Sequence, residues 1–575
     1  MKRLNHKFDV CIIGGGMAGI CAAIAAARHG AKVAIVQDRP MFGGNSSSEI
    51  RLHVCGADRH NAIKNVRETG ILEEIRMENL RRNPQRSYSI WDTVLYEKML
   101  LEPNITYFLN CSCMDAKTSR SRTKSITAWQ LTTYTFHTIE ADIFADCSGD
   151  GVLATLTGAL YRVGREARSE YNESIEPEVA DSKTMGMTCF FMAKDMGSPQ
   201  PFERPSWAYE YPTEESFPHR GHGWIKMGYW WIELGGEDDS IADTETIRDE
   251  LLKIVYGMWD HIKNHGDHGA ENWALDWIQF LPGKRESRRY IGDHVLTQND
   301  VEAEGRFDDR VAFGGWTMDD HHPAGFKFPG KPTIFHPAPS PYGISYRCLY
   351  SKNIDNLMFA GRCASASHAA MSSTRVMGTA AVMGQALGTA AAMAIKYKIS
   401  PRAVGKSHIT ELQQTLLRDD AYIPWLPMIF NDLTRRAALK ASSGTPEPLR
   451  DGINRPVGDD QHAWIGQIGD SIEYTWKDLR HVDRAVLILD SALHKNVQLS
   501  HLQHDDQLNH LPEEMVKDLR LEIRSGGNWQ PWRELKGNYQ RLVRLNVSAE
   551  VDGVRVTFDS TWGAPQVRVF AFYME

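Results

Sequence analysis

The sequence of 575 residues lacks the cysteine patterns that mark disulfide frameworks, zinc ribbons and iron–sulfur proteins. Its nine cysteines are scattered and include no C-x-x-C pair, so we predict no metal site and no ferredoxin-type cluster. An odd number of cysteines without a framework is typical of a reducing compartment. The N-terminal segment, MKRLNHKF, has no signal-peptide apolar region, and a cytoplasmic protein is therefore expected.

Long apolar runs are also missing. The two most apolar stretches, 14–27 and 378–394, are shorter than the roughly 20 residues that a membrane span needs, and both are rich in glycine and alanine. Such composition is typical of closely packed internal helices, so no membrane partner is predicted. The net charge of −8 and the lack of a nucleic-acid motif argue against a nucleic-acid partner.

A glycine-rich motif lies between two expected strands near the N-terminus. Residues 8–13 are continuously apolar and predict a buried strand, which the sequence GGGMAG over 14–19 follows directly. An alanine-rich helix is expected over 20–29 and a second strand over 32–36. This β-α-β context turns a weak G-x-G-x-x-G match into a specific signal for a dinucleotide site.

Each residue of the motif has a physical role in binding a pyrophosphate. Gly14 permits the tight turn, and Gly16 lets the backbone approach the phosphates. Gly19 lets helix and strand pack closely. The N–H groups of the first turn, with Met17 and Ala18, then present a partial positive charge to the ligand.

The residue at the end of the second strand departs from the usual pattern. An acidic side chain normally binds the adenosine ribose there, whereas this chain has Gln37 followed by Asp38. A glutamine can still hydrogen-bond a hydroxyl, and Asp38 is a second candidate. We therefore assign the ribose contact to this pair.

The run 36–49, with the sequence VQDRPMFGGNSSSE, resembles the FAD-dependent oxidoreductases grouped with the flavoprotein subunit of heterodisulfide reductase. It is more distantly similar to the fumarate reductase flavoproteins. In those proteins the loop after the second strand wraps the pyrophosphate and reaches the isoalloxazine. The resemblance implies FAD as the cofactor, contacted by Gly43, Gly44, Asn45 and Ser46.

Three later segments extend the resemblance. The stretch 143–151 resembles a family strand end and implies that Gly149 and Asp150 lie near FAD. The stretch 356–363 is similar to the strand before the last FAD-binding helix and contributes Gly361, although Arg362 stands where many relatives carry aspartate.

The third segment is the helix expected after residue 368. Its N-terminal dipole, near Gly378, can point at the pyrimidine edge of the flavin and stabilise negative charge on the reduced ring.

The C-terminal part has another periodicity. Residues 400–445 predict amphipathic helices and 442–448 a linker. Six later segments mostly alternate apolar and polar residues and predict an antiparallel β-sandwich: 471–476, 484–490, 519–523, 541–546, 553–558 and 566–572. Their order resembles a galactose-binding or discoidin-type module, which would bind carbohydrate, cover the enzyme or mediate homodimerisation.

These elements predict an α/β FAD/NAD(P)-binding Rossmann-type fold with an inserted α+β substrate domain, plus a C-terminal β-sandwich. The length exceeds the roughly 250–300 residues at which a single core stops growing. The expected domains are FAD-binding, first part (1–164), substrate insert (165–350), FAD-binding, second part (351–400), helical connector (401–450) and β-sandwich (451–575).

The insert holds the candidate substrate groups. Its aromatic residues predict either core packing or a flat wall for sugar stacking. The run 283–289 includes Arg288; arginines there either bind a substrate carboxylate or form an interdomain salt-bridge cluster. The run 316–323 includes His321 and predicts either acid–base groups or a polar loop.

His368 and Arg375 are further candidates, because the resemblance places both near the flavin. One of them could orient or deprotonate a small polar, carbohydrate-derived substrate while hydride passes to the flavin; alternatively both only pack beside the cofactor. An electron-transfer subunit and a non-catalytic glycan-binding protein are the other two functions that the sequence leaves open.

Overall fold

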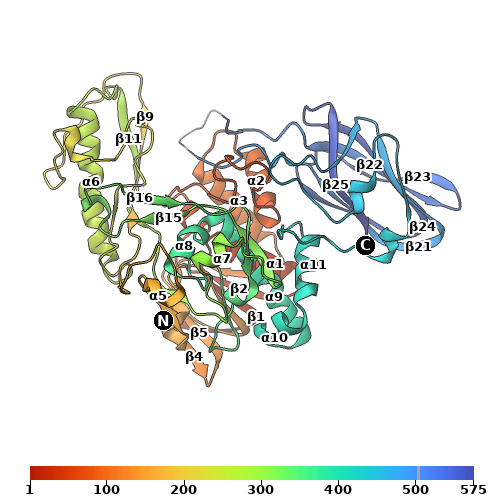
Figure 1. Ribbon diagram of the computed structural model, residues 1–575, viewed down its shortest axis with the longest axis horizontal. Helices are drawn as coiled ribbons and strands as arrows, with labels where there is room; N and C mark the ends of the chain where they lie inside the picture. Colours follow the sequence, from red (N-terminus) through yellow and green to blue (C-terminus); the bar gives the residue numbers. More distant parts are fainter. Residues whose placement is uncertain (501–505) are drawn as a thin grey trace.

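The computed structural model describes residues 1–500 and 506–575 (Figure 1). A central α/β unit carries the N-terminal residues, an insert rich in loops lies on one side of it, and a β-rich unit made by the C-terminal residues lies on the other. The predicted fold class is confirmed, with a Rossmann-type core, an inserted α+β part and a β-sandwich.

The central sheet has a parallel core in the order β3-β2-β1-β6-β18. β2 is apolar and buried at every position, as expected of a strand covered on both faces. Two antiparallel strands, β4 and β5, extend this sheet from the first half of β6. The strand bounds are β1 (Lys2–Ile13), β2 (Val33–Val36), β3 (Ile105–Phe108), β4 (Cys111–Ser119), β5 (Arg122–Gln130), β6 (Thr135–Asp146) and β18 (Leu357–Phe359).

Two apolar helices, α1 (Met17–Arg28) and α9 (Met377–Tyr397), pack closely against each other. A Cβ on Gly384 or Gly388 would lie 2.1 Å from a carbonyl oxygen of α1, so only glycine allows this approach. Within the described residues α9 is the one helix long and apolar enough to cross a membrane, and 94% of its apolar window is buried in the protein. The other helices of the core are α2 (Ile71–Arg82), α3 (Tyr88–Leu100), α4 (Val152–Thr157) and α8 (His368–Thr374).

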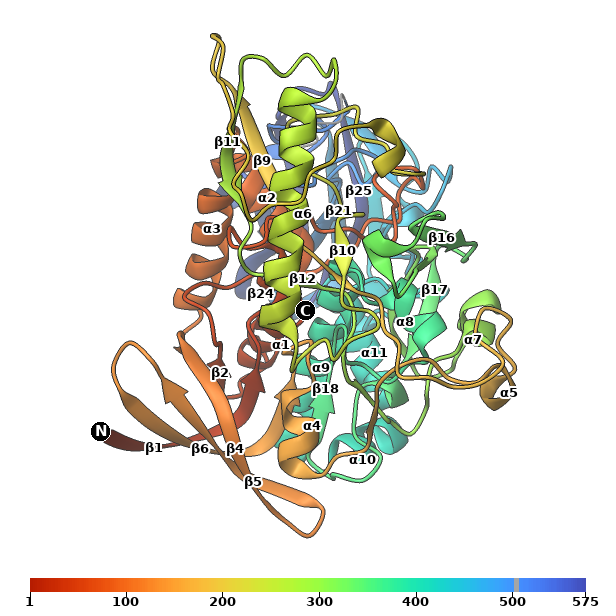
Figure 2. The same cartoon turned by 90° about the vertical axis from the view of Figure 1, so that its left-hand side faces the viewer.

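The insert lies between α4 and β18 and is built around a long helix. Figure 2 shows α6 along its outer side, with β9 and β11 beside it. Its helices are α5 (Arg168–Tyr171), α6 (Thr244–Asn264) and α7 (Gln298–Glu302). Its strands are β7 (Tyr161–Arg162), β8 (Met187–Thr188), β9 (Phe191–Asp195), β10 (Glu233–Leu234), β11 (Trp273–Ile278), β12 (Gly283–Lys284), β13 (Arg289–Tyr290), β14 (Arg310–Gly314), β15 (Met318–His321), β16 (Thr333–His336) and β17 (Tyr342–Ser345).

The aromatic residues of the insert divide into two groups. Tyr229 and Trp231 stack with ring centroids 4.8 Å apart, and Trp259 on α6 is buried beside them, so these rings form the core. Trp207 and Trp224 remain 51% and 42% exposed. The core interpretation therefore holds for the buried rings, and only the exposed rings are available to a flat ligand.

The C-terminal unit is one antiparallel sheet path, β20-β25-β21-β24-β22-β23, with β19 added to β21. The predicted pairs of short strands are merged in the structure, because β21 and β24 each run through two of them. The bounds are β19 (Ala438–Ala441), β20 (Trp464–Gln467), β21 (Ser471–Leu489), β22 (Val516–Ser525), β23 (Asn528–Leu535), β24 (Leu542–Thr561) and β25 (Gln566–Met574).

The connector before this unit is only partly helical. α10 (Pro401–Ser407), α11 (Ile409–Arg418) and the short α12 (Asp432–Arg435) are helices. The predicted helical connector over 401–450 and the linker over 442–448 are wrong in their last part, since β19 pairs with β21 and Ser442 N–H bonds the Ser471 carbonyl. The β-unit thus begins before residue 451.

Buried arginines fix the β-unit on the FAD-binding core. Arg67 is 1% exposed, pairs with Glu73 and donates to the Ser491 carbonyl of the β-unit. Arg541 of the β-unit is 2% exposed and pairs with Asp420 at 2.9 Å. The Arg67–Ser491 hydrogen bond and the buried Arg541–Asp420 pair both cross the contact, which makes this a fixed interface rather than a tethered module.

Candidate active site

The glycine loop before α1 has the geometry that a dinucleotide requires. Gly14 has φ +99°, and a Cβ there would lie 2.5 Å from the Cys147 backbone. A Cβ on Gly19 would lie 1.9 Å from the Gly14 oxygen, so helix and strand touch at this position. A Cβ on Gly16 would instead meet, among the described residues, only Gly44 Cα at 3.9 Å. The loop is therefore closed on the protein side and open at Gly16.

The N-termini of α1 and α9 lie next to each other, and among the described residues no side chain accepts hydrogen bonds from their first N–H groups. In the described parts of the chain neither helix has a side-chain cap, and neither carries an acid in its first turn. Gly361, with φ +85°, joins them, because a Cβ on it would touch both Ala18 and Ala380. At α9, however, the Gly378 N–H donates to the Cys55 carbonyl at 2.7 Å and Glu68 lies against this glycine, so the predicted contact of Gly378 with FAD is not available there. The uncapped start of α1 at this glycine-lined opening fits the anionic groups of a dinucleotide.

The N-terminus of α8 provides a contrast within the same core. Ser367 accepts from the Ala370 N–H, Glu166 from the His368 N–H and Glu176 from the Ala369 N–H. Protein side chains thus satisfy this helix. The open N-terminus of α1 is therefore not a general property of helices in this core.

The two residues predicted to contact the ribose have different environments. Gln37 is buried, accepts from Gly15 N–H at 2.7 Å and donates to the Met41 carbonyl, so its carboxamide holds the loop together. Asp38 leaves 55% of its side chain exposed, 3.8 Å from Arg39. Asp38 is thus the residue of the pair with acceptor oxygens directed to solvent.

The loop predicted to wrap FAD folds back onto the glycine motif. Gly43 N–H donates to the Gly15 carbonyl, and Gly44 lies against Gly16. Asn45 donates to the Lys284 carbonyl at 3.2 Å. Ser46 is buried and bonds the Gly43 carbonyl, so it supports the loop from inside.

Asp150, near this loop, pairs with two cationic side chains and accepts a hydrogen bond from a hydroxyl group. Lys284 Nζ and Arg362 Nη2 each lie 2.9 Å from its carboxylate, and Ser287 donates to it. Burial opposes ionisation, yet Arg362 and Lys284 hold the pKa of Asp150 below its usual range. Arg362 also lies against Gly149, where a Cβ would come within 2.7 Å of its guanidinium. The arginine that replaces the family aspartate therefore pairs with the acid of the neighbouring turn.

His368 is the centre of a buried charge array. Its Nδ1 lies 2.9 Å from Glu286 and its Nε2 lies 3.2 Å from Asp320. Burial alone would lower the pKa of His368, but Glu286 and Asp320 raise it well above its usual range. Arg289 pairs with Glu286 and, at 2.7 Å, with Glu166. The array therefore holds an imidazolium between two carboxylates.

His321 is the centre of a second array of the same kind. Its Nδ1 lies 2.7 Å from Glu233 and its Nε2 lies 3.2 Å from Asp319, which also pairs with Arg375 at 3.1 Å. Burial opposes protonation here too, yet Asp319 and Glu233 raise the pKa of His321. In both arrays the flanking carboxylates therefore favour the protonated histidine.

One strand and one helix junction connect the arrays to the dinucleotide loop. β15 supplies Asp319 to one array and Asp320 to the other, because successive side chains of a strand point in opposite directions. Arg375 directly precedes Val376, the N-cap of α9. The arrays thus adjoin the N-terminus of α9.

The sequence profile of the FAD dependent oxidoreductase family matches residues 9–416. The chain belongs to the FAD dependent oxidoreductase family. The matched range includes every part of the glycine-lined opening and both histidine arrays, so FAD is the cofactor that this opening fits. When bound, FAD supplies hydride chemistry, while the protein supplies position and charge.

Other comparisons match parts of the oxidoreductase. A soluble pyridine nucleotide transhydrogenase of Chromohalobacter salexigens is 58% identical over 40 residues, which are 7% of this chain and 9% of that protein. Quinol fumarate reductase of E. coli is 13% identical with a TM-score of 0.29, covering 72% of this chain and 75% of that one. A family 32 carbohydrate-binding module of Streptococcus pneumoniae EndoD is 15% identical with a TM-score of 0.19, covering 25% of this chain and 99% of that one.

The four predicted catalytic residues do not gather at one point of the oxidoreductase. His368, His321 and Arg375 belong to the two arrays. Arg288 instead lies over the Tyr161 ring and donates to the Asp150 carbonyl at 3.4 Å. The run 316–323, for which a polar loop was the alternative, contains β15, which pairs with β16.

Several acids of the site were missed at the level of sequence. Glu166, Glu173 and Glu176 surround the N-terminus of α8 from a segment without helical or strand periodicity. Glu286 lies inside the run 283–289, whose arginines were the predicted functional groups, and it pairs with Arg289. A buried histidine signals that partners exist, but sequence spacing does not identify them.

Glu176 predicts a measurable pH dependence of stability. It is 1% exposed, and within the described residues its Oε2 has no hydrogen-bond partner. Burial, more than any neighbour, raises its pKa to about 7. Since the folded state then binds the extra proton, the contribution of this group to stability falls as pH rises from about 4.5 to 7. Replacing Glu176 with Gln should stabilise the protein at pH 8 by roughly 1–3 kcal/mol and leave it nearly unchanged at pH 5.

Thermal unfolding at the two pH values measures this effect. The matched control is Glu178→Gln, since the Glu178 side chain is 77% exposed. Equal shifts for both variants at pH 8, or a Glu176→Gln variant less stable than the wild type there, would contradict the assignment.

Proposed function

We propose that this oxidoreductase transfers hydride between its flavin and a small polar substrate carrying hydroxyl groups, with a carbohydrate-derived compound as the favoured class. The observation that carries the proposal is the graded exposure along the His368 array. Glu286 and His368 leave 0% and 2% of their side chains exposed, whereas Asp320 leaves 22%. Asp320 is thus the end of the array that a substrate can reach.

Asp320 has the properties of a general base. Burial raises its pKa, but the hydrogen bond and charge of His368 outweigh burial and hold that pKa below its usual range. An ionised carboxylate backed by an imidazolium can accept the proton of a substrate hydroxyl, and the array spreads the resulting charge change. His368 acts through Asp320, because both of its ring nitrogens are already bonded.

Arg375 supplies a donor for the substrate. Its Nη2 pairs with Asp319, while its Nε is buried and, within the described residues, makes no hydrogen bond. Because successive side chains of β15 point in opposite directions, this donor lies on the Asp319 side of the strand and would bind a different polar group of the substrate from the one that meets Asp320. Polar lining of this kind suits a polyol or sugar better than an apolar compound.

Anaerobic bleaching of the flavin spectrum tests the proposal. FAD-loaded protein is mixed with polyols, aldoses, glycosides and 2-hydroxy acids, and the rate of flavin reduction is recorded for each. Asp320→Asn should slow reduction by the best compound on the order of 10²–10⁴-fold and leave the amount of bound FAD unchanged. The control is Asp238→Asn on the exposed surface of the insert. Reduction only by compounds without hydroxyl groups, or an unchanged rate in Asp320→Asn, would refute the proposal.

A further inference from the structure

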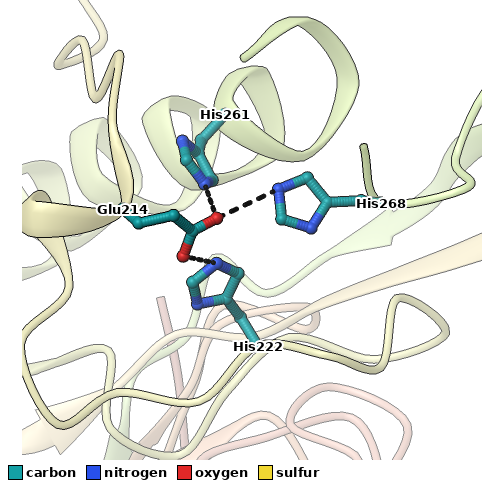
Figure 3. Close-up of side chains that lie close together, drawn as sticks. All are labelled: Glu214, His222, His261 and His268. Carbon is teal, nitrogen blue, oxygen red and sulfur yellow. Dashed lines mark hydrogen bonds and ion pairs between the residues drawn. The ribbon is translucent and has the colours of Figure 1, made fainter. Parts of the chain in front are cut away.

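Three histidines and one glutamate of the insert converge on a single point, away from the two charge arrays. Glu214 lies on a short 3-10 helix (Glu214–Ser216), His222 on the segment after it, His261 in the last turn of α6 and His268 on the following loop. Their ligand atoms all lie within 4.8 Å of one another. Figure 3 shows the three rings arranged around the Glu214 carboxylate. We propose that these four side chains form a zinc site.

The tautomers of two rings favour a cation at this point. His222 Nδ1 lies 2.9 Å from the Arg220 carbonyl and His261 Nδ1 lies 2.8 Å from the Tyr211 carbonyl. A carbonyl can only accept, so each Nδ1 carries a proton, and in a singly protonated ring Nε2 presents its lone pair towards Glu214. A backbone carbonyl on the outer nitrogen is the arrangement that orients metal-binding histidines.

Those lone pairs face acceptors rather than donors. His222 Nε2 lies 3.1 Å from one Glu214 oxygen, and His261 Nε2 lies 3.2 Å from the other. A neutral imidazole nitrogen and a carboxylate oxygen repel each other unless a cation lies between them. The positive charge that these contacts require comes either from a second proton on each ring or from a metal ion, and the metal ion also gives His268 Nε2 a partner.

His268 completes the set and gives the strongest sign of a missing partner. Its Nε2 is buried and, in the described parts of the chain, has no hydrogen-bond partner; the nearest Glu214 oxygen is 3.7 Å away. The ring centroids of the three histidines are 5.0–5.3 Å apart, and one nitrogen of each ring comes within 4.8 Å of the others.

The ligand types select the metal. Three imidazole nitrogens and one carboxylate oxygen form a four-coordinate set of borderline softness, which suits Zn²⁺ in tetrahedral geometry. Four protein ligands leave no position for a substrate, so the site is structural. Calcium and magnesium prefer oxygen ligands throughout and are disfavoured.

A metal here would connect four segments of the insert and brace the charge arrays. His222 bonds the carbonyl of Arg220, whose guanidinium donates to the Gly325 and Phe328 carbonyls. Those carbonyls follow β15 in the chain, the strand that carries Asp319 and Asp320. Holding the loop at His222 therefore supports the segment just after the proposed base. Because the ligands come from distant positions, the sequence alone predicted no metal site.

Metal analysis of the full-length FAD-loaded protein tests the proposal. Protein produced in zinc-supplemented medium and dialysed should retain about one zinc ion per chain by mass spectrometry, and a His222→Gln/His268→Gln variant should retain less than about a tenth. The matched control, His219→Gln, changes an exposed histidine of the same loop and should keep the wild-type zinc content. FAD absorbance of each variant verifies that it is folded.

Cobalt provides a second readout that does not depend on purification history. Protein stripped with a chelator and titrated with Co²⁺ should show the intense visible bands of tetrahedral cobalt, and these should be missing in His268→Gln alone. Zn²⁺ should raise the thermal unfolding midpoint of the stripped wild type but not that of the double variant. The proposal is overturned if the wild type holds no stoichiometric zinc and gains no stability from it. Stoichiometric copper, nickel or iron in place of zinc would overturn the assignment of the metal.

Discussion

Gly16→Ala should yield a folded, colourless protein. The glycine has φ −73° and ψ −177°, which any residue adopts, and a Cβ would meet among the described residues only Gly44 Cα at 3.9 Å. The methyl group therefore costs little in the polypeptide itself. It would instead occupy the space through which the α1 N–H groups reach the FAD pyrophosphate. FAD affinity should fall on the order of 100-fold or more, which corresponds to about 2.7 kcal/mol.

Titration of the apoprotein with FAD, followed by fluorescence, measures this loss. The thermal unfolding midpoint of apo Gly16→Ala should match that of the apo wild type. Gly14→Ala is the contrasting variant: its Cβ would lie 2.5 Å from the Cys147 backbone, with φ +99°, so it should lower both stability and FAD binding. Wild-type FAD content in Gly16→Ala would mean that the pyrophosphate does not pass over this residue.

The glycine loop was predictable from the sequence because its requirements are local. Positive φ at Gly14 and close contact at Gly19 each require glycine. The residue types alone therefore indicate the backbone geometry. Gln37 shows the limit of this logic. Its position at the strand end was predicted, but its hydrogen bond to Gly15 depends on how the loop folds back.

The charge arrays were only half predictable. His321 was selected as part of a polar run, and His368 and Arg375 because the family resemblance places both near the flavin. Their carboxylate partners come from β10, β12–β13 and the segment near α5, far away in the chain. Tertiary packing determines which buried charges pair, so these pairs cannot be predicted from the periodicity of the sequence.

The length of the two long strands of the β-unit, β21 and β24, was not predicted, for a different reason. Residues 477–481 are exposed and, apart from Leu479, polar, which at the sequence level predicts a break between two strands. In the structure β21 continues through them, because the strand extends past the core and needs no apolar face there. Register shifts in its pairing with β24 accommodate this stretch.

His368→Gln should abolish most turnover without removing FAD. Glutamine can still donate to one of Glu286 and Asp320, but the positive charge between these carboxylates is lost. The rate of flavin reduction by substrate should fall on the order of 10²–10⁴-fold. Loss of a buried charge partner should also destabilise the fold by roughly 3–5 kcal/mol, and His368→Ala should do so more strongly.

The pH profile distinguishes this role from simple packing. With His368 gone, its hydrogen bond and charge no longer oppose burial and only the weaker effects of His321 and His336 remain, so the pKa of Asp320 should rise. Because the ionised carboxylate is the base, the acid limb of the flavin-reduction profile should move to higher pH in His368→Gln. His294→Gln, which breaks a histidine–aspartate pair outside the arrays, should leave rate and profile unchanged. A slower variant whose acid limb stays at the wild-type pH would show that His368 supports the fold but does not hold Asp320 ionised.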